Sequence, residues 1–234
     1  MIELLQGDCL EVMKGIPDGS MDAIITDPPY GTTACKWDSV IDFNLMWEQL
    51  NRIIKPNGAI VLFGSEPFSS SLRMSNIKNY KYDWIWHKNS VSGFTNEKRQ
   101  PMRNYESISV FYNKQCNYYP IKEKRDLSKK SKERHKYDFN TTTEIKSSVY
   151  GKMKRKKDNP SDLCYPKTIK KFKCIVNNSK ERLHPTQKPI LLMEYLIKTY
   201  TNEGETVLDF TMGSGSTLVA CDNLNRNGIG IEMD

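Results

Sequence analysis

The fold is organised around the segment Met21-Asp22-Ala23-Ile24-Ile25-Thr26-Asp27-Pro28-Pro29-Tyr30. Its first six residues are an apolar run that predicts a strand, and the acid, two prolines and tyrosine predict a rigid loop where the strand ends. Each proline fixes φ at about −65° and removes a backbone donor. The loop therefore presents a carboxylate and carbonyl oxygens beside the ring of Tyr30, which suits a planar group bearing an NH2. A Pro-Pro turn with a buried tyrosine is the plainer interpretation, and these residues alone leave both open.

The composition bounds the class of protein. A chain of 234 residues can form one sizeable core with an insertion, or two small domains. No run approaches the length of a membrane span, and we expect no signal peptide before Met1. The six cysteines include no CxxC pair and the three histidines have no metal-ligand spacing, so we expect a reducing compartment, no disulfide and no metal site. These features predict a soluble, cytoplasmic protein.

The positive charge is concentrated in one central segment. Residues 114–182 contain 21 Lys and Arg against 8 Asp and Glu, whereas the rest of the chain contains 14 and 20. A polyanion is the natural partner of such a segment. Its basic clusters alternate with aromatic residues, which favours an ordered module, or one that folds on binding, over a solvated disordered insert.

Hydrophobic periodicity predicts the other elements. Strands are expected at 2–6, 21–26, 59–63, 82–86, 105–112, 206–209 and 228–232, and helices at 10–14, 43–55, 64–74, 190–200 and 216–224. Asp42 is the expected cap of the second helix, and Pro56-Asn57-Gly58 its expected end. Strands that alternate with helices predict βαβ units and a mainly parallel sheet, with a polar loop at Asn89–Pro101.

A glycine-rich turn follows the strand 206–209. The run Asp209-Phe210-Thr211-Met212-Gly213-Ser214-Gly215-Ser216 leads into a helix, and the next strand ends at Glu232. Glycines allow a ligand to approach the backbone closely, and a carboxylate at the following strand tip can bind ribose hydroxyls. The turn lacks the third glycine of a dinucleotide fingerprint and the lysine of a P-loop. The context predicts an adenosine-type cofactor without a pyrophosphate.

With His184-Pro185-Thr186-Gln187-Lys188-Pro189, these two motifs resemble the β class of amino-group DNA methyltransferases, which use S-adenosylmethionine. The resemblance covers nearly the whole chain outside 113–182. It implies an α/β fold, a circularly permuted Rossmann-like S-adenosylmethionine-dependent methyltransferase sheet with an inserted target-recognition region. Residues 1–112 would form the catalytic half of the methyltransferase domain, 113–182 the basic insert, and 183–234 the cofactor-binding half. The Asp209 strand would lie beside the Asp27 strand, with the strands that lead to Glu232 and Asp8 further out.

The resemblance also assigns roles. Asp27 and the Pro28 carbonyl would accept the two hydrogens of an exocyclic amine, so that its nitrogen can attack the sulfonium methyl group. The catalytic residues implied are Asp27, Pro28, Pro29 and Tyr30, with Tyr30 stacked on a base flipped out of the duplex. The cofactor-binding residues implied are Asp8, Cys9, Asp27, His184, Pro185, Thr186, Gln187, Lys188, Asp209, Phe210, Thr211, Gly213, Ser214, Gly215, Ser216 and Glu232.

Among these, Glu232 would hold the ribose and Asp8 the adenine amino edge of the cofactor. The turn 211–215 would lie against the methionine part, closed by 184–189. Asp8 as an ordinary loop acid is an equal alternative, and His184 fits a packing role better than catalysis.

These expectations define a site-specific DNA methyltransferase that acts on the N6 amino group of adenine, because the motif begins with Asp27. Methylation of cytosine N4 is the first alternative. The second is a catalytically weak DNA-binding remnant, because the family usually continues past Asp234 with a helix that covers the strand 228–232. One side of that strand is therefore expected to be exposed, covered by a second subunit or loosely held. Methylation of a protein amide is disfavoured, since that loop usually begins with asparagine.

The resemblance implies double-stranded DNA as the partner and no association with a membrane. A homodimer and a companion restriction endonuclease, as in restriction-modification, are further candidates.

Overall fold

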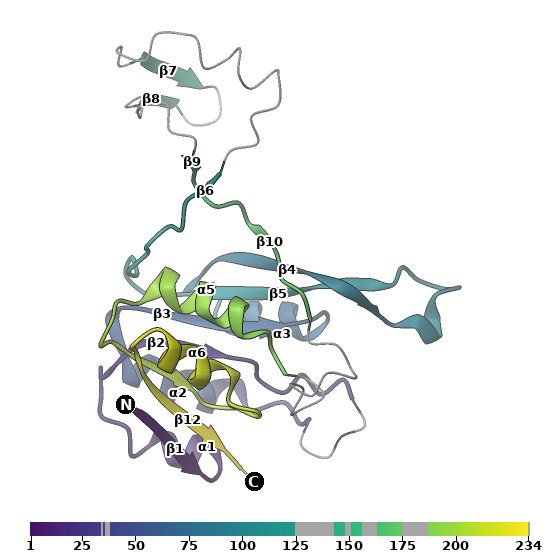
Figure 1. Ribbon diagram of the computed structural model, residues 1–234, viewed down its shortest axis with the longest axis vertical. Coiled ribbons are helices and arrows are strands. Elements are labelled where there is room, and N and C mark those ends of the chain that lie inside the picture. The colour runs from purple at the N-terminus through teal and green to yellow at the C-terminus, as the bar shows by residue number, and fades with distance from the viewer. Residues whose placement is uncertain are drawn as a thin grey trace. The chain divides into compact units, whose positions relative to one another are not determined.

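The computed structural model describes residues 1–33, 35, 38–124, 143–147, 151–155, 163–174 and 187–233, with backbone alone for 143–147 and 151–155. The chain forms two compact units (Figure 1). The first combines Met1–Tyr119 with Lys167–Asp234, and the second is Pro120–Pro166.

An eight-stranded sheet forms the centre of the first unit. Its order is β1 (Ile2–Gln6), β12 (Asn227–Glu232), β11 (Thr206–Asp209), β2 (Met21–Thr26), β3 (Ile54–Gly64), β5 (Arg103–Phe111), β4 (Tyr80–Ser92) and β10 (Ile169–Lys171). The first five strands of this order are parallel to one another, whereas β5 is antiparallel to β3 and β4. This is the mixed α/β sheet that the sequence predicts.

The order of the strands confirms the expected permutation. β11 and β12, from the C-terminal part of the chain, lie between β1 and β2 from its N-terminal part. β12 is hydrogen-bonded to a neighbour on each edge, and its Ile231 is fully buried. The expectation of an exposed or loosely held strand 228–232 is therefore wrong for the described residues, because α1 and α6 pack around this strand.

β2 is the most enclosed strand, since each of its six residues is buried. A strand with helices on both sides reads as a continuous apolar run. The one acid within it, Asp22, is neutralised by Lys55 Nζ at 2.6 Å from Oδ1 and accepts a hydrogen bond from the Thr206 backbone N–H at 2.9 Å. This pairing lets β2 occupy the centre of the sheet.

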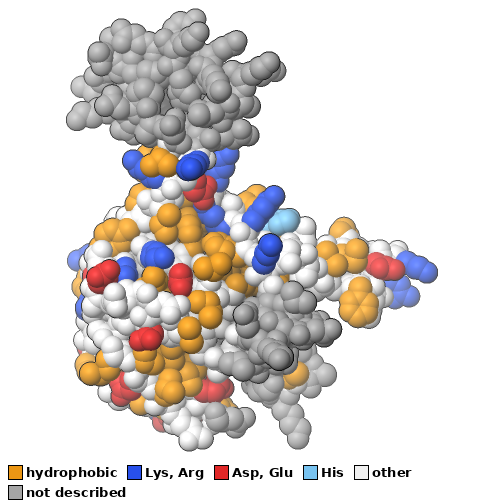
Figure 2. All heavy atoms as spheres, viewed as in Figure 1, with side chains coloured by type: hydrophobic (Ala, Val, Ile, Leu, Met, Phe, Trp, Pro, Cys, Tyr) orange, Lys and Arg blue, Asp and Glu red, His pale blue; other side chains and the backbone are white. Residues whose placement is uncertain are grey.

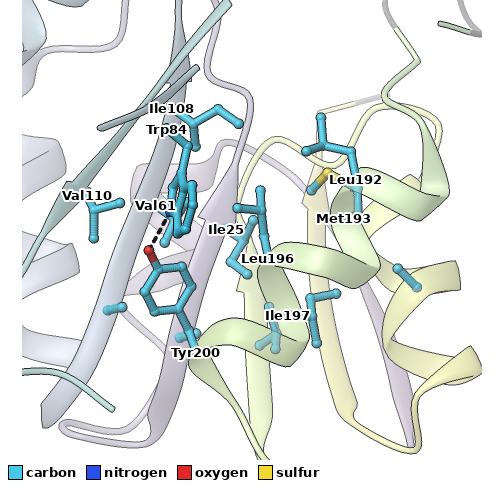
Figure 3. Packing of buried hydrophobic residues seen from close by; sticks show 14 of the residues in the cluster. Ile25, Val61, Trp84, Ile108, Val110, Leu192, Met193, Leu196, Ile197 and Tyr200 are labelled. Carbon is cyan, nitrogen blue, oxygen red and sulfur yellow. Dashed lines mark hydrogen bonds between the residues drawn. The ribbon is translucent and has the colours of Figure 1, made fainter. Parts of the chain in front are cut away.

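Helices cover both faces of the sheet (Figure 1). α5 (Ile190–Tyr200) and α6 (Ser216–Asn223) pack on one face, and α1 (Cys9–Met13), α2 (Phe43–Ile53) and α3 (Phe68–Ser75) on the other. The first core is seen in Figure 3, where Leu196 and Ile197 of α5 face Ile25. Tyr200 anchors it, since its buried hydroxyl accepts a hydrogen bond from Trp84 Nε1 at 2.8 Å.

Most predicted elements are confirmed within two residues of their expected ends, and Asp42 caps α2 through the N–H groups of Asn44 and Leu45. The exceptions are α3, which begins at Phe68 and not at the expected residue 64, and the strands β3 and β4. β3 begins at Ile54, so Pro56-Asn57-Gly58 lies inside the strand, where a shift in the β2–β3 register absorbs the extra residues. β4 continues to Ser92 and β5 begins at Arg103, so much of the expected 89–101 loop belongs to a hairpin.

The second unit contains two short antiparallel pairs. β6 (Glu123–Lys124) pairs with β9 (Leu163–Cys164), and β7 (Thr143–Ser147) with β8 (Gly151–Arg155). The first unit includes 113–119 and 167–174 of the predicted 113–182 insert. Residues 125–142, 148–150, 156–162 and 175–182 of that insert lie outside the described residues, and its recognition role stays a prediction. Among the helices that the structure describes, none combines the length and apolar character needed to cross a bilayer.

Candidate active site

The tips of β2 and β11 bring the proline loop and the glycine turn together. These strands pair in parallel, with Leu208 opposite Ile24, so both end at the same edge of the sheet. Beyond the strands, the Thr211 hydroxyl donates a hydrogen bond to the Asp27 carbonyl oxygen at 3.1 Å. The carboxyl ends of parallel strands are where open α/β sheets bind ligands. The two motifs therefore share one edge of the sheet, as the sequence predicts.

Asp38 holds the proline loop in shape. Its carboxylate accepts hydrogen bonds from four consecutive backbone N–H groups, those of Tyr30, Gly31, Thr32 and Thr33, at 2.6 to 2.9 Å. Burial alone would raise the pKa of Asp38, but these donors outweigh it and lower the pKa. Gly31 has φ of +66°, a conformation that favours glycine. The sequence analysis missed Asp38, whose only sequence signal is an acid shortly after two prolines.

Tyr30 touches the catalytic candidate directly. Its hydroxyl donates to Asp27 Oδ1, and its ring stacks on Phe68 with centroids 5.0 Å apart and planes at 30°. Burial, followed by the charge of Asp27, raises the pKa of Tyr30 well above its ordinary value. The phenol therefore stays protonated and donates. One face of the ring is covered by Phe68, which restricts any stacked base to the other face.

An alternating row of charges extends from Asp27. Lys188 Nζ donates to Asp27 Oδ2 and lies 3.5 Å from Glu106 Oε2, while Lys88 Nζ donates to Glu106 Oε1. The four groups come from the proline loop, the segment just before α5, β5 and β4. We call Asp27, Lys188, Glu106 and Lys88 the charge row. The Asp27 side chain is 23% exposed and that of Lys188 is 10% exposed, so the outer end of the row is the carboxylate.

Burial sets the proton affinities along this row. It raises the pKa of Asp27, with a further contribution from the charge of Glu106, and the Lys188 ammonium only partly offsets the increase. Burial would lower the pKa of Lys188, but the two carboxylates reverse this and raise it. Burial would raise the pKa of Glu106, yet Lys188 and Lys88 hold it below its usual value. Lys188 is thus a permanent cation beside an unusually basic aspartate.

Glu106 and Lys88 are site residues that the sequence analysis missed. Glu106 is the single acid of β5 and directly precedes the alternating run Ser107-Ile108-Ser109-Val110, and this was the signal available. Lys88 packs its ammonium over Trp86, 5.1 Å from the ring centroid. Lys188 lies similarly over Phe63, at 5.2 Å. Aromatic faces and carboxylates together replace the water that these cations lose.

Asp209 has a different environment from Asp27. It is 4% exposed, and its oxygens accept hydrogen bonds from the hydroxyls of Thr26 and Thr217 and from the Thr211 N–H. Burial raises the pKa of Asp209 to about 6. These contacts link β2, β11 and the start of α6. The carboxylate acts as an internal brace, and its predicted contact with a cofactor stays a prediction.

The glycine turn provides room for a ligand. Gly213 and Gly215 have φ of +49° and +74°, and a Cβ at either position would meet nothing within 4 Å. The Gly213 N–H donates to Glu232 Oε2 at 2.7 Å, so the turn is tied to the tip of β12. Space over the turn and a carboxylate beside it fit an adenosine-type group whose ribose hydroxyls need an acceptor.

Asp8 lies at the next strand tip. Gln6 is opposite Glu232 in the β1–β12 ladder, and the Gly7 N–H donates to the Glu232 carbonyl at 2.9 Å. Asp8 Oδ1 caps α1 by accepting from the N–H groups of Leu10 and Glu11. Burial, with the nearby Asp8 and Glu232 charges, raises the pKa of the Cys9 thiol to about 11, so it is neutral. Asp8, Cys9 and Glu232 therefore share one end of the site, as the sequence predicts.

The other predicted residues divide into four groups. Pro28 and Ser216 are buried beside the site, whereas Pro29, Gln187 and Ser214 are partly exposed. Phe210 belongs to the core under α1 and α2, so its side chain points away from a ligand over the turn. His184, Pro185 and Thr186 lie outside the described residues.

A cavity of about 400 Å³ opens at the other end of β3 and is lined by Asn51, Lys55, Asn79 and Lys114 among others. It contains none of the predicted site residues, because it lies at the amino end of the parallel strands.

Comparison with known proteins places this geometry in a family. The model of the DNA methylase family matches residues 21–234. The type II methyltransferase M.HpaI of Haemophilus parainfluenzae is 29% identical over 99% of the chain and 70% of its own length. M.HinfI of Haemophilus influenzae is 28% identical over 99% of the chain and 64% of its own length.

Solved structures agree with this assignment. The crystal structure of an M1.HpyAVI–SAM complex is 27% identical, with a TM-score of 0.65 over 100% of this chain and 94% of that one. The PvuII DNA methyltransferase (cytosine-N4-specific) is 15% identical with a TM-score of 0.64, covering 100% and 82%, and shows the shared fold alone. S-adenosylmethionine is the cofactor of these enzymes. The chain belongs to the N6/N4 DNA methylase family, the amino-group DNA methyltransferases.

Proposed function

We propose that this chain transfers a methyl group from S-adenosylmethionine to the N6 amino group of an adenine flipped out of duplex DNA. The observation that carries the proposal is the position of Asp27. Its carboxylate is partly exposed, has a raised pKa, and lies at the tip of β2 next to the glycine turn after β11. An acceptor for an amine and a place for a methyl donor are thus adjacent.

Asp27 and the Pro28 carbonyl act on the amine. An exocyclic amine is a weak nucleophile because its lone pair is delocalised into the ring. If these two oxygens accept its hydrogens, the nitrogen can move towards a tetrahedral geometry and expose the lone pair. A carboxylate offers about four acceptor positions. Asp27 can therefore keep Tyr30 and Lys188 as donors and accept one amine hydrogen as well.

The transfer forms one N–C bond as one S–C bond breaks, and the nitrogen then loses a proton. S-adenosylmethionine, when bound, supplies the electrophilic methyl group on its sulfonium. Asp27 is the nearest base to the amine in this proposal, and its raised pKa favours acceptance of that proton. Lys188 stabilises the carboxylate before transfer and fixes its orientation. Fixed acceptors at the point where positive charge develops lower the barrier.

The remaining roles follow the geometry of the strand tips. Glu232 would accept hydrogen bonds from the ribose hydroxyls, and Asp8 from the adenine amino edge of the cofactor. Asp8 Oδ1 already caps α1, so this role needs its other oxygen. Tyr30 would stack on the target base with the face that Phe68 leaves uncovered. Residues 184–189 would cover the methionine end of the cofactor.

Adenine is favoured over cytosine because Asp27 begins the motif, where a serine often marks cytosine N4 methylation in relatives of this class. The chemistry of the acceptors suits either amine, so cytosine N4 is the alternative. The test incubates the protein with S-adenosylmethionine labelled in its methyl group and unmethylated DNA, followed by digestion to nucleosides. Label in N6-methyladenosine supports the proposal, and label in N4-methylcytosine selects the alternative.

A catalytically weak DNA-binding remnant is the second alternative. It predicts that the protein binds the cofactor and DNA without transfer. Cytoplasmic location, a homodimer and a companion restriction endonuclease stay predictions.

A further inference from the structure

A β-hairpin arm extends from the strands that carry the charge row. It consists of Asn89–Tyr105, the end of β4, the 3-10 turn η1 (Phe94–Asn96) and the start of β5. Every residue of this arm is exposed. Figure 1 shows it as a ribbon that leaves the edge of the sheet, and Figure 2 shows apolar and charged side chains along it.

The arm exposes side chains that a protein normally buries. Phe94 is 71% exposed, Val91 53% and Met102 43%. None of them belongs to either hydrophobic core. An isolated two-stranded hairpin is marginally stable in water. An aromatic residue held at the tip of such a hairpin indicates a surface that acts on a partner.

The arm is fixed at its base and tip by polar contacts. Arg103 donates to Ser65 Oγ at 2.6 Å and to the Glu66 carbonyl at 3.0 Å, and Asn89 Oδ1 accepts from the Cys174 N–H at 2.6 Å. At the tip, the Arg99 and Gln100 N–H groups donate to the Asn96 carbonyl. These bonds hold the exposed Phe94 in place without burying it.

The excess of basic residues in the arm favours an anionic partner. The charged residues of the arm are Lys98, Arg99 and Arg103 against the single acid Glu97. Basic side chains beside an exposed aromatic ring are the combination that contacts phosphates and bases together. A purely apolar partner surface would provide no counter-charge for Lys98 and Arg99. A nucleic acid provides phosphates for these cations and stacked bases for the aromatic ring.

The reach of the arm matches this partner. Lys88 and Glu106, members of the charge row, are the residues that flank the arm on its two strands. From Lys88 to Ser92 an extended strand covers about 13 Å, and the turn adds to this. The major groove of DNA is about 12 Å wide and accepts a two-stranded ribbon. A duplex whose base lies at Asp27 is therefore within reach of the tip.

We propose that the hairpin arm binds duplex DNA beside the target base, with Lys98 and Arg99 on phosphates and Phe94 against the base pairs. Apolar side chains of this kind enter duplexes where bases are unstacked. The inference extends the proposed function, on which it rests for the position of the target base.

The charge contribution is tested with Lys98→Ala/Arg99→Ala. The control is Lys78→Ala/Lys81→Ala, which removes two exposed lysines at the opposite end of β4. Anisotropy of a fluorescein-labelled 30-base-pair duplex from unmethylated DNA gives the affinity at several salt concentrations. Two lost phosphate contacts reduce the slope of log affinity against log salt by about 1.8. The control keeps the wild-type slope.

The aromatic contribution is tested with Phe94→Ala against Ile77→Ala, another exposed apolar residue at the far end of β4. The loss of one base contact weakens duplex binding by roughly 5- to 100-fold for Phe94→Ala, with the salt slope unchanged. The Ile77 variant binds as wild type does. Unchanged binding of S-adenosylmethionine by all four variants shows that the sheet is intact.

Arm variants that bind the duplex as tightly as their controls, with the same salt slope, overturn the inference. So does a wild-type protein that binds no duplex. If the arm variants bind DNA normally and also transfer methyl groups to it, the proposed function is supported and the arm has no part in it. DNA binding that depends on the arm, without methyl transfer, would support the arm and refute the proposed activity.

Discussion

Asp27 and Asp209 end neighbouring parallel strands, yet their surroundings make them different groups. Asp27 is partly exposed and bound by an ammonium and a phenol, whereas Asp209 is buried and bound by two threonine hydroxyls and a backbone N–H. Lys188 partly offsets the increase in the pKa of Asp27 that burial causes, and the exposed part of this carboxylate can accept an incoming donor. At Asp209, threonine hydroxyls fill the hydrogen-bonding positions of a buried carboxylate, which is therefore not accessible to a ligand. In the function proposed above, the same residue type at one edge of the sheet serves chemistry at Asp27, whereas at Asp209 it joins the strands to α6.

The largest effect is expected from Asp27→Asn. The amide cannot accept a proton and presents only one good acceptor, so methyl transfer to DNA falls by about 10²- to 10³-fold. Binding of S-adenosylmethionine and DNA is retained. The measurement is labelled methyl transfer with excess substrate, and Asp42→Asn, a cap of α2 outside the site, is the control. Transfer at the wild-type rate would remove Asp27 from catalysis.

The second prediction is that Asp209 makes the free energy of unfolding depend on pH. Its pKa in the folded protein, about 6, exceeds the ordinary 3.8, so the folded state binds its proton more tightly than the unfolded state does. Stability therefore falls as pH rises from about 4 to about 6, by up to roughly 3 kcal/mol, and stays reduced above that.

Asp209→Asn removes this dependence, because the amide does not titrate. Urea unfolding of the wild type and the variant at pH 4, 5, 6 and 7 gives the difference in free energy of unfolding between them. A difference that does not change with pH would contradict a raised pKa at this position.

Glu106→Gln tests how the charge row sets the properties of Asp27, and we expect it to decrease methyl transfer by about tenfold. The charge of Glu106 contributes to the raised pKa of Asp27. Its removal lowers that pKa, so the acidic limb of the pH–rate profile moves to lower pH. Lys88→Met is the companion variant, since it leaves Glu106 in place but unpaired on one side. A merely structural role for Glu106 would reduce the rate at every pH without moving the limb.

The smallest effect is expected from Gly213→Ala, in the glycine turn that follows Asp209. At φ of +49° an alanine costs about 1 kcal/mol of stability, and its Cβ enters the space over the turn. The dissociation constant for S-adenosylmethionine rises by about fivefold. Gly204→Ala, at φ of +79° in open space, has the same backbone cost without the effect on the cofactor. Calorimetric titration and thermal unfolding separate the two.

Local signals predicted the elements well because they depend on neighbours in the chain. The apolar run of β2, the cap at Asp42 and the glycine turn each form within a few residues, and the structure confirms all three. The end of α2 was the weaker prediction. Pro56-Asn57-Gly58 is a turn signal on its own, but pairing with β2 carries the strand through it. Tertiary pairing overrode a local preference.

Local patterns in the chain were enough to predict the strands and helices, and the resemblance predicted the order in which the strands lie. Which carboxylates are available to a ligand depends on contacts that form only in the folded protein. The sequence shows Asp27, Asp38, Glu106 and Asp209 simply as four acids. In the fold their partners are Lys188, the loop N–H groups, Lys88 and two threonines. Lys188 lies 161 positions from Asp27 along the chain. Proton affinity depends on what lies within a few ångströms in space, and sequence distance carries no information about it.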